Sequence, residues 1–442
     1  MTSVAEAKPA RDPRLRVALL LGFADQALVS AANLGLGLIV LHGGTKEEYG
    51  LYGLGSALVL LFTGAVGGMI SSQMTAIAPN RQGNDALTFC AAMGIGQVWI
   101  CGPLAVAGLA LIGGLYGGGT LGRDMAAMLA ASALAGVGVA MHEYFRSFMY
   151  LQFHPGRAFG LTLSLVAVWT VTTVLLVEVA AMPAHWAAIV GYGGGSLVSS
   201  LIALRWSGLP WRAGRFGVGA ALAEAWPGGR WALLGVVSIF AQNQSYIYLL
   251  TVLDGPAAVG EANAARLLLA PLMLIIVSTI RTLQPRVGRS RAAGDGQGVW
   301  RLSWITLFTL LATTVLYSVG VIAVMPYAIG TLLPEAYAGV TSLTVLWSIA
   351  FVAQCVRSVP QMLLQVIRGF RQITSASIVS GALVFVISLV AIPYAGVFGS
   401  LMCIVGGEIL LSLLLARNLV HARRSGAFCP CAPKRRVFID GH

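Results

Sequence analysis

The chain has 442 residues, of which 57% are hydrophobic and only 10% are charged. A soluble domain carries about 25% charged residues, so this composition excludes a water-soluble globular protein. The net charge of +12 would suit a nucleic-acid-binding protein, but the basic residues lie in the breaks between long apolar runs. Membrane topology therefore explains the charge, and no nucleic-acid partner is expected.

Twelve apolar runs follow one another along the chain, each near or above the roughly 20 residues that a helix needs to cross a bilayer. A backbone inside lipid has to satisfy its hydrogen bonds internally, which long uniform apolar runs do as helices rather than as barrel strands. The sequence therefore predicts an all-α integral membrane protein with about twelve transmembrane helices. The runs cover residues 17–41, 51–79, 87–113, 124–148, 159–181, 186–206, 231–253, 262–283, 301–326, 340–366, 374–394 and 397–417.

The basic residues between these runs indicate how the chain is oriented. Of the 28 Lys and Arg residues, 24 lie in the leader, the tail, every second connection or the adjoining ends of the runs, which together are expected to form one side of the membrane. The opposite side carries only Lys46 and Arg123. Because Lys and Arg are enriched in cytoplasmic loops, both termini are expected in the cytoplasm, which requires an even number of spans.

The longest internal connection divides the twelve runs into two groups of six. A cytoplasmic leader, 1–16, precedes a first lobe, 17–206, and an amphipathic connection, 207–230, is expected to lie along the inner membrane surface. A second lobe, 231–417, is followed by a basic cytoplasmic tail, 418–442. The two halves begin with loosely similar stretches, which predicts a repeat about an axis along the membrane normal.

The polar side chains inside the apolar runs are the candidate functional residues, because an ionisable group at the bilayer centre costs about 2.5–3.5 kcal/mol on insertion scales. Arg357 lies deep in the tenth run. Gln354, Gln361 and Gln365 share its helix face. This face predicts a substrate-binding surface, where the guanidinium would hold a diphosphate or sugar hydroxyls. The alternative is an internal ion pair with Glu408, which lies at a comparable depth in the twelfth run.

Further candidates for substrate binding lie in the seventh and eighth runs. Gln242, Asn243 and Gln244 are consecutive near the middle of the seventh run. They lie around much of a helical turn, so they line a sugar-binding cavity or form hydrogen bonds with neighbouring helices. Arg266, one turn inside the outer end of the eighth run, either contacts substrate or anchors the helix at the headgroups.

Three carboxylates in or beside the runs are candidates for coupling or gating, because pumps use intramembrane carboxylates as cation and proton sites. Asp25 adjoins the polar face of the first run, whose Asn33 is a further candidate for substrate binding. Helix packing is the alternative role for Asp25. Glu143 closes the fourth run and either acts as a gate or pairs with Arg146, one turn away. Glu408 is the third carboxylate, with the ion pair named above as its alternative.

No catalytic or cofactor-binding motif accompanies these residues. The chain has neither a phosphate-binding P-loop nor an HExxH zinc motif. The C-x-C formed by Cys429 and Cys431 lacks the second pair that a zinc site needs. The sequence therefore predicts a transporter without cofactor or metal rather than an enzyme, with a membrane-embedded enzyme of polysaccharide assembly as an alternative.

Three segments resemble a family of bacterial membrane proteins. Residues 32–61 combine a helix with scattered polar residues, a short GTKEEYG loop and a second helix. Residues 142–159 read HEYFRSFMYLQFHPGRAF and contain an acidic-aromatic-aromatic-Arg cluster. Residues 229–275 include a GPAAVG loop followed by an Ala-Ala-Arg helix start. In order and placement these segments are similar to Wzx-type polysaccharide and O-antigen flippases, of the multidrug/oligosaccharidyl-lipid/polysaccharide (MOP) exporter superfamily.

The resemblance implies a flippase that moves undecaprenyl-diphosphate-linked oligosaccharide across the bacterial inner membrane by alternating access of two six-helix lobes. It implies exopolysaccharide or O-antigen (lipopolysaccharide) assembly as the process, with membrane lipids, a polysaccharide polymerase and export machinery as partners. The family's cavity is often cationic, and this chain departs from that pattern because few arginines lie within its first-half spans. A cation-coupled multidrug-type exporter is the alternative within transport.

Overall fold

The computed structural model describes residues 13–367 and 369–425. Within these residues the chain consists of helices joined by short turns, apart from one isolated bridge between Ile329 and Leu333. The predicted all-α class is therefore confirmed for the described part of the chain. The first twelve residues of the leader, Arg368 and the tail from residue 426, with its two cysteines, lie outside the described residues.

The helices follow the predicted runs closely. Long apolar sequences favour helix in lipid, and most helix ends coincide with the polar connections. The bounds are α1 (Pro13–Gly43), α2 (Lys46–Met69), α3 (Ser71–Ile77), η1 (Ala78–Asn80), α4 (Gly83–Gly117), α5 (Arg123–Leu151), α6 (Pro155–Glu178), α7 (Ala184–Ser207), α8 (Trp211–Gly214), η2 (Arg215–Gly217), α9 (Val218–Asn243), α10 (Ser245–Leu253), α11 (Pro256–Leu267), α12 (Ala270–Ala292), α13 (Gly296–Ala328), η3 (Glu335–Tyr337), α14 (Val340–Val366) and α15 (Phe370–Arg424).

The protein is a multi-pass membrane protein. Within the described residues, nine helices are long and apolar enough to cross a bilayer, or eleven if each of two bent helix pairs counts as one span. The first bent pair joins α9 to α10 at 49°, and the second joins α11 to α12 at 57°. The predicted seventh and eighth runs are thus broken rather than straight helices. The second break precedes Pro271, which has no N–H to continue the hydrogen-bond ladder of α11.

The connection between the sixth and seventh runs, residues 207–230, is largely helical. Its last helix, α9, begins at Val218 and continues without interruption into the seventh run. Ala221 and Ala225 are buried in the same core cluster as the α4 and α5 side chains. This burial of small apolar residues packs the first turns of α9 against the core of the first unit.

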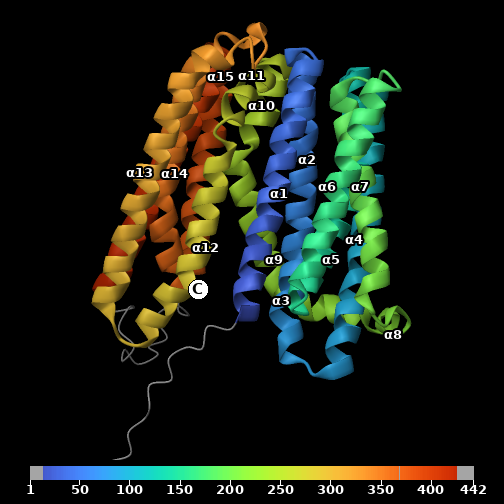
Figure 1. Ribbon diagram of the computed structural model, residues 1–442, viewed down its shortest axis with the longest axis vertical. Helices are drawn as coiled ribbons and strands as arrows, with labels where there is room; N and C mark the ends of the chain where they lie inside the picture. The colour runs from blue at the N-terminus through green and yellow to red at the C-terminus, as the bar shows by residue number, and fades with distance from the viewer. Residues whose placement is uncertain (1–12, 368, 426–442) are drawn as a thin grey trace, which may run out of the picture. The chain divides into compact units, whose positions relative to one another are not determined.

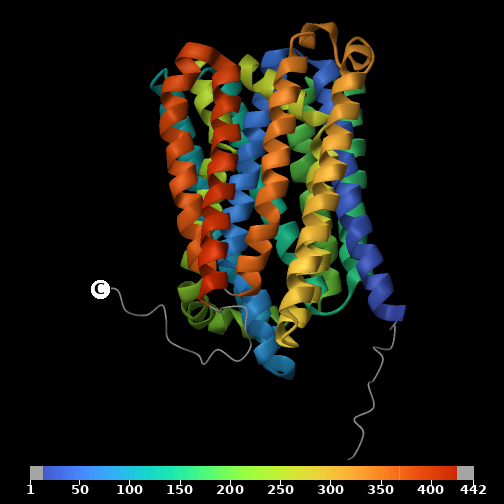
Figure 2. The same ribbon diagram turned by 90° about the vertical axis from the view of Figure 1, so that its left-hand side faces the viewer.

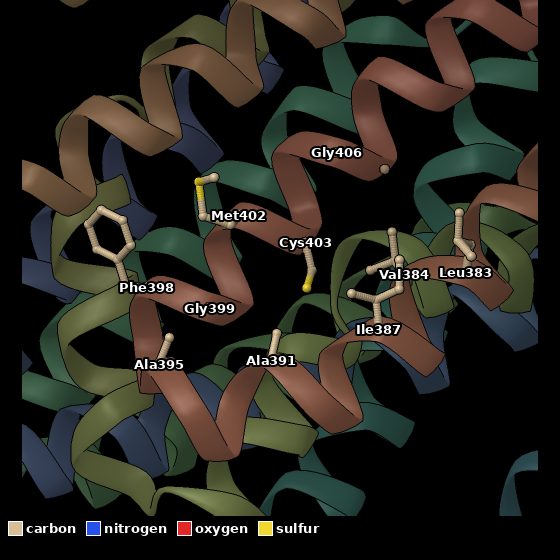
Figure 3. Close-up of a pocket in the computed structure, with 11 residues that line it drawn as sticks. Leu383, Val384, Ile387, Ala391, Ala395, Phe398, Gly399, Met402, Cys403 and Gly406 are labelled. Atoms are coloured by element: carbon tan, nitrogen blue, oxygen red, sulfur yellow. The ribbon is translucent and has the colours of Figure 1, made fainter.

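The final helix, α15, is a hairpin of two antiparallel arms (Figure 2). The chain turns at Gly396, whose φ of 52° and ψ of −134° are open only to glycine at low cost. Ser380 Oγ donates to the carbonyl of Gly407 at 2.8 Å, and Asn418 Nδ2 donates to the carbonyl of Gln372 at 3.3 Å. The two arms therefore run antiparallel. Close-packed small residues and an apolar cavity of about 470 Å³ lie along them (Figure 3).

The described chain divides into two compact units. Neither unit is one continuous stretch of sequence, because short segments of the first half cluster with the second. Within the described residues, the first unit comprises 13–36, Leu58–Met182 and Trp186–Ala232, and the second comprises Gly37–Ala57, Pro183–His185, 233–367 and 369–425.

In the first unit, α4 and α5 form the centre of the core. Phe89, Met93, Tyr144 and Phe148 are buried together, and the Tyr144 hydroxyl donates to the carbonyl of Cys90. Beside this core α6 and α7 lie side by side (Figure 1). They approach closely at glycines of α7, in the manner of small-residue contacts between membrane helices.

In the second unit, α14 is the central helix and packs against α11, α12, α13 and α15 (Figure 1). Met362 and Leu363 anchor one core cluster, in which Val287 of α12 and Val299 of α13 are also buried. The Trp347 indole donates to the carbonyl of Ala262 at 2.9 Å, which fixes α14 against α11. This arrangement places the polar face of α14 between several helices of the same unit.

The N-terminal end of α2 belongs to the second unit, where it crosses α11. A side chain at Gly50 would collide with the carbonyl of Pro256, so the two backbones are in direct contact. Lys46 forms an ion pair with Glu261 at 2.5 Å and lies over the ring of Tyr337. Burial, and then the charge of Glu261, raise the pKa of the Tyr337 phenol. The phenol therefore stays neutral beside the ion pair.

Candidate functional site

The clearest candidate site in the second unit centres on Arg357 of α14. Its Nε donates to Oε2 of Glu408 on α15 at 2.7 Å, and its Nη1 donates to Oε1 of Gln361, one turn along α14, at 2.8 Å. The side chains of Arg357 and Glu408 are only 13% and 4% exposed. A buried arginine this well bonded to a carboxylate is held in one orientation.

A third helix holds the carboxylate from the other side. Gln242, near the end of α9, is buried and its Nε2 donates to Oε1 of Glu408 at 3.3 Å. Glu408 thus accepts a hydrogen bond on each of its oxygens. The network joins α9, α14 and α15, and it accounts for two residues that the sequence proposed separately as a substrate contact and a coupling carboxylate.

Arg357 also borders a cavity of about 310 Å³ between α12 and α14. The α14 wall is polar and carries the amides predicted from the stripe around Arg357. The α12 wall is mainly apolar, with one further amide. The lining residues are Met273, Ile276, Val277, Ile280 and Gln284 of α12, and Gln354, Arg357, Ser358, Gln361, Met362 and Gln365 of α14.

The α12 wall was not identified from the sequence. Its residues recur at three- and four-residue spacing from Met273 to Gln284, which is the signature of one helix face. This spacing is visible in the sequence, but an apolar helix face cannot be distinguished from the other apolar residues of the same run. Only the pairing of α12 with α14 shows that Gln284 joins the other amides.

Other residues proposed from the sequence do not line this cavity. Asn243 ends α9 and Gln244 lies at the break before α10. Arg266 of α11 lies over the ring of Trp347, at 5.2 Å from its centroid, in a cation–π contact. In the first unit Asn33 is exposed and its amide donates to the carbonyl of Val29 in its own helix.

A second cluster of charges lies within the first unit. Arg146 of α5 donates through Nη1 to Oδ2 of Asp25 at 2.9 Å and through Nη2 to Oε2 of Glu143 at 2.7 Å. The Tyr150 hydroxyl also donates to Oδ2 of Asp25, at 2.9 Å. The pairing of Glu143 with Arg146 follows from helical spacing, whereas the contact with Asp25 depends on the packing of α1 against α5.

Asp25 is the most deeply placed acid of this cluster, at 2% exposure. Its other oxygen, Oδ1, is buried without a hydrogen-bond partner. An unpartnered buried carboxylate oxygen is costly and marks a place where a hydrogen-bond donor or a cation would be stabilising. Among the described residues, no group of three or more His, Cys, Asp or Glu side chains is arranged to hold a metal ion.

No protein-family model and no curated protein matches the sequence. Solved structures do match. A structure of the lipid II flippase MurJ in an inward closed conformation is 13% identical, with a TM-score of 0.73 over 92% of this chain and 87% of that one. An inward-facing multidrug resistance MATE family transporter of the MOP superfamily is 13% identical, with a TM-score of 0.66 over 89% of this chain and 95% of its own.

A MATE transporter from Vibrio cholerae is similar to the same degree, at 13% identity and a TM-score of 0.63 over 94% of this chain and 98% of that chain. At such low identity the likeness defines the fold. The chain therefore shares the fold of these structures, which a lipid flippase and multidrug transporters have in common.

Proposed function

We propose that this protein is a flippase that moves undecaprenyl-diphosphate-linked oligosaccharide across the bacterial inner membrane, for exopolysaccharide or O-antigen assembly. The observation that supports this most is the similarity to the MurJ lipid II flippase over 92% of the chain. The amide-lined cavity beside Arg357 adds a polar surface of the kind that a glycan headgroup needs inside a membrane domain.

In this proposal the chain crosses the membrane twelve times, with both termini in the cytoplasm. The two arms of α15 are counted as separate spans, and each bent pair is one span. The cargo passes by alternating access, with its lipid tail remaining in the bilayer. A polysaccharide polymerase and export machinery act on the product.

The proposed site residues have distinct roles. Gln354, Arg357 and Gln361 contact the cargo in the α12–α14 cavity. Gln242 and Glu408 hold Arg357 in place, and Glu408 is also a candidate coupling group. Further proposed contacts to the cargo come from Asn33, Asn243, Gln244 and Arg266, and Asp25 and Glu143 are the remaining candidates for coupling or gating.

Deletion of the gene tests the function. The deleted strain is expected to accumulate undecaprenyl-diphosphate-linked oligosaccharide and to lose polymer, and the intact gene restores both. Normal polymer with no accumulated intermediate would show that the protein is not this flippase.

Two variants of α14 then test the site. Arg357→Ala is expected to reduce rescue strongly. It removes a guanidinium that borders the cavity, and it leaves the buried carboxylate of Glu408 without its cation. Val356→Ala is the matched control, since Val356 is the neighbouring residue, is exposed and does not line the cavity. Full rescue by Arg357→Ala would remove Arg357 from the site and leave the function standing.

The second candidate is a cation-coupled multidrug-type exporter, as the MATE-like fold allows. The unpartnered oxygen of Asp25 supports it, because a buried carboxylate of this kind suits a proton or cation site. This candidate predicts that deletion raises sensitivity to lipophilic cations while pools of lipid-linked oligosaccharide stay normal. The two phenotypes distinguish the candidates in one strain.

A further inference from the structure

The α12–α14 cavity contains a positive charge that is already neutralised. Among its described lining side chains, Arg357 is the only charged one. The carboxylate of Glu408 lies 2.7 Å from its Nε, and Glu408 is itself fixed by Gln242. A guanidinium and a carboxylate in contact at this burial act together as a neutral, strongly dipolar group.

This charge balance is unsuitable for a diphosphate. A diphosphate carries at least two negative charges, and a buried anion is stable only where opposite charge or many donors compensate it. Here the single described cation is paired, and the adjacent carboxylate would repel the ligand. The described lining residues therefore offer no net attraction to the phosphate part of a lipid-linked sugar.

The two walls instead suit an uncharged sugar. Gln354, Gln361 and Gln365 on α14, with Gln284 on α12, supply carboxamides that both donate and accept hydrogen bonds, as hydroxyls and acetamido groups require. The aliphatic side chains of α12 form a facing apolar surface, against which the C–H face of a sugar ring packs. At about 310 Å³, the cavity is at the small end of ligand pockets, which run from roughly 300 to 1,000 Å³, and takes a small part of a glycan.

We propose that the α12–α14 cavity is a subsite for an uncharged, hydroxyl- and amide-rich portion of the cargo, and that Glu408 sets this specificity by neutralising Arg357. The subsite rests on the proposed function for the identity of the cargo as a lipid-linked glycan. The neutralisation of Arg357 by Glu408, and the resulting exclusion of anions, is called the charge rule below. It does not depend on transport and is measurable as ligand binding.

The charge rule is tested by calorimetric titration of inorganic pyrophosphate into the full-length protein in nanodiscs. The wild type is expected to bind pyrophosphate only weakly. Glu408→Gln frees the charge of Arg357 and is expected to bind pyrophosphate about tenfold more tightly than the wild type or better, a change of about 1.4 kcal/mol. The double variant Arg357→Gln/Glu408→Gln, which restores neutrality, is expected to lose this binding.

Two results overturn the charge rule. One is pyrophosphate binding by the wild type that is removed by Arg357→Gln or by Arg281→Gln, the nearest basic position on α12. The other is a folded Glu408→Gln protein that gains no affinity for pyrophosphate. If Glu408→Gln does not fold, Glu408→Ala takes its place, since it also removes the negative charge beside Arg357.

The glycan part is tested with the oligosaccharide repeat released by partial hydrolysis of the strain's own polymer. We expect this probe to bind the wild type and to bind Gln361→Leu about tenfold more weakly, with Val356→Ala unchanged. Equal binding to the wild type and Gln361→Leu, or no binding, overturns the subsite. Failure of the proposed function appears separately, as absence of accumulated intermediate in the deleted strain, and the pyrophosphate titration still decides the charge rule.

Discussion

At the scale of single residues, the arginines of the two charged sites described above lie in ion pairs rather than alone. Arg357 is paired with Glu408, and Arg146 is shared between Asp25 and Glu143. For Arg357 the sequence left ligand contact and ion pairing as alternatives, and the structure contains the ion pair beside a cavity. Pairing does not exclude contact with cargo, because one guanidinium has five N–H donors.

The pair between Asp25 and Arg146 makes a prediction about stability. Arg146→Gln removes the cation that compensates a carboxylate only 2% exposed, and breaking a buried pair from one side costs about 3–5 kcal/mol. The melting temperature of the detergent-purified protein should therefore fall clearly. The double variant Asp25→Asn/Arg146→Gln should recover part of that loss, because no uncompensated charge remains. Equal melting temperatures for the single and double variants would show that the pair carries no coupling energy.

At the scale of helices, glycines determine where elements meet and where they turn. The backbones of α2 and α11 touch at Gly50, and α15 reverses at Gly396. These two glycines act through different physics, since one provides space for a neighbouring backbone and the other provides a conformation that side chains disfavour.

The crossing of α2 and α11 predicts that Gly50→Ala is destabilising. The added methyl group would collide with the carbonyl of Pro256, and forcing extra volume into a packed contact costs about 1–3 kcal/mol. Gly67→Ala, in the same helix, is the matched control because nothing lies within 4 Å of its added Cβ. Melting temperature measures the difference, and identical values for the two variants would mean that α2 moves away from α11 without cost.

The turn in α15 makes a prediction of the same kind. Gly396→Ala places a side chain at a φ of 52° and a ψ of −134°, where a non-glycine residue costs about 1–3 kcal/mol. Gly406→Ala, in the second arm, lies in open space and serves as the control. Lower thermal stability is expected for Gly396→Ala alone. If both variants match the wild type, α15 tolerates another geometry at its turn.

At the scale of the whole molecule, basic residues on one side of the membrane predict the topology. Cysteine labelling tests it in a background that lacks the six native cysteines, four of which are buried in the described structure. Thr120→Cys, between α4 and α5, should react with a membrane-impermeant maleimide from the periplasmic side. Gln82→Cys, before α4, should react only when the cytoplasmic face is accessible. The reverse pattern would invert the proposed orientation.

The sequence by itself determined the class of the protein, the approximate position of its helices and the residues worth testing. Hydrophobicity and helical spacing are local properties, so they located α14 with its polar face and the pair of Glu143 with Arg146. Only the tertiary structure decided which of these polar residues share a site. The contact of Asp25 with Arg146 and the addition of Gln284 to the cavity both depend on which helices pack together. Helix pairing in a membrane is set by shape and by a few polar contacts, which apolar runs of similar composition do not distinguish.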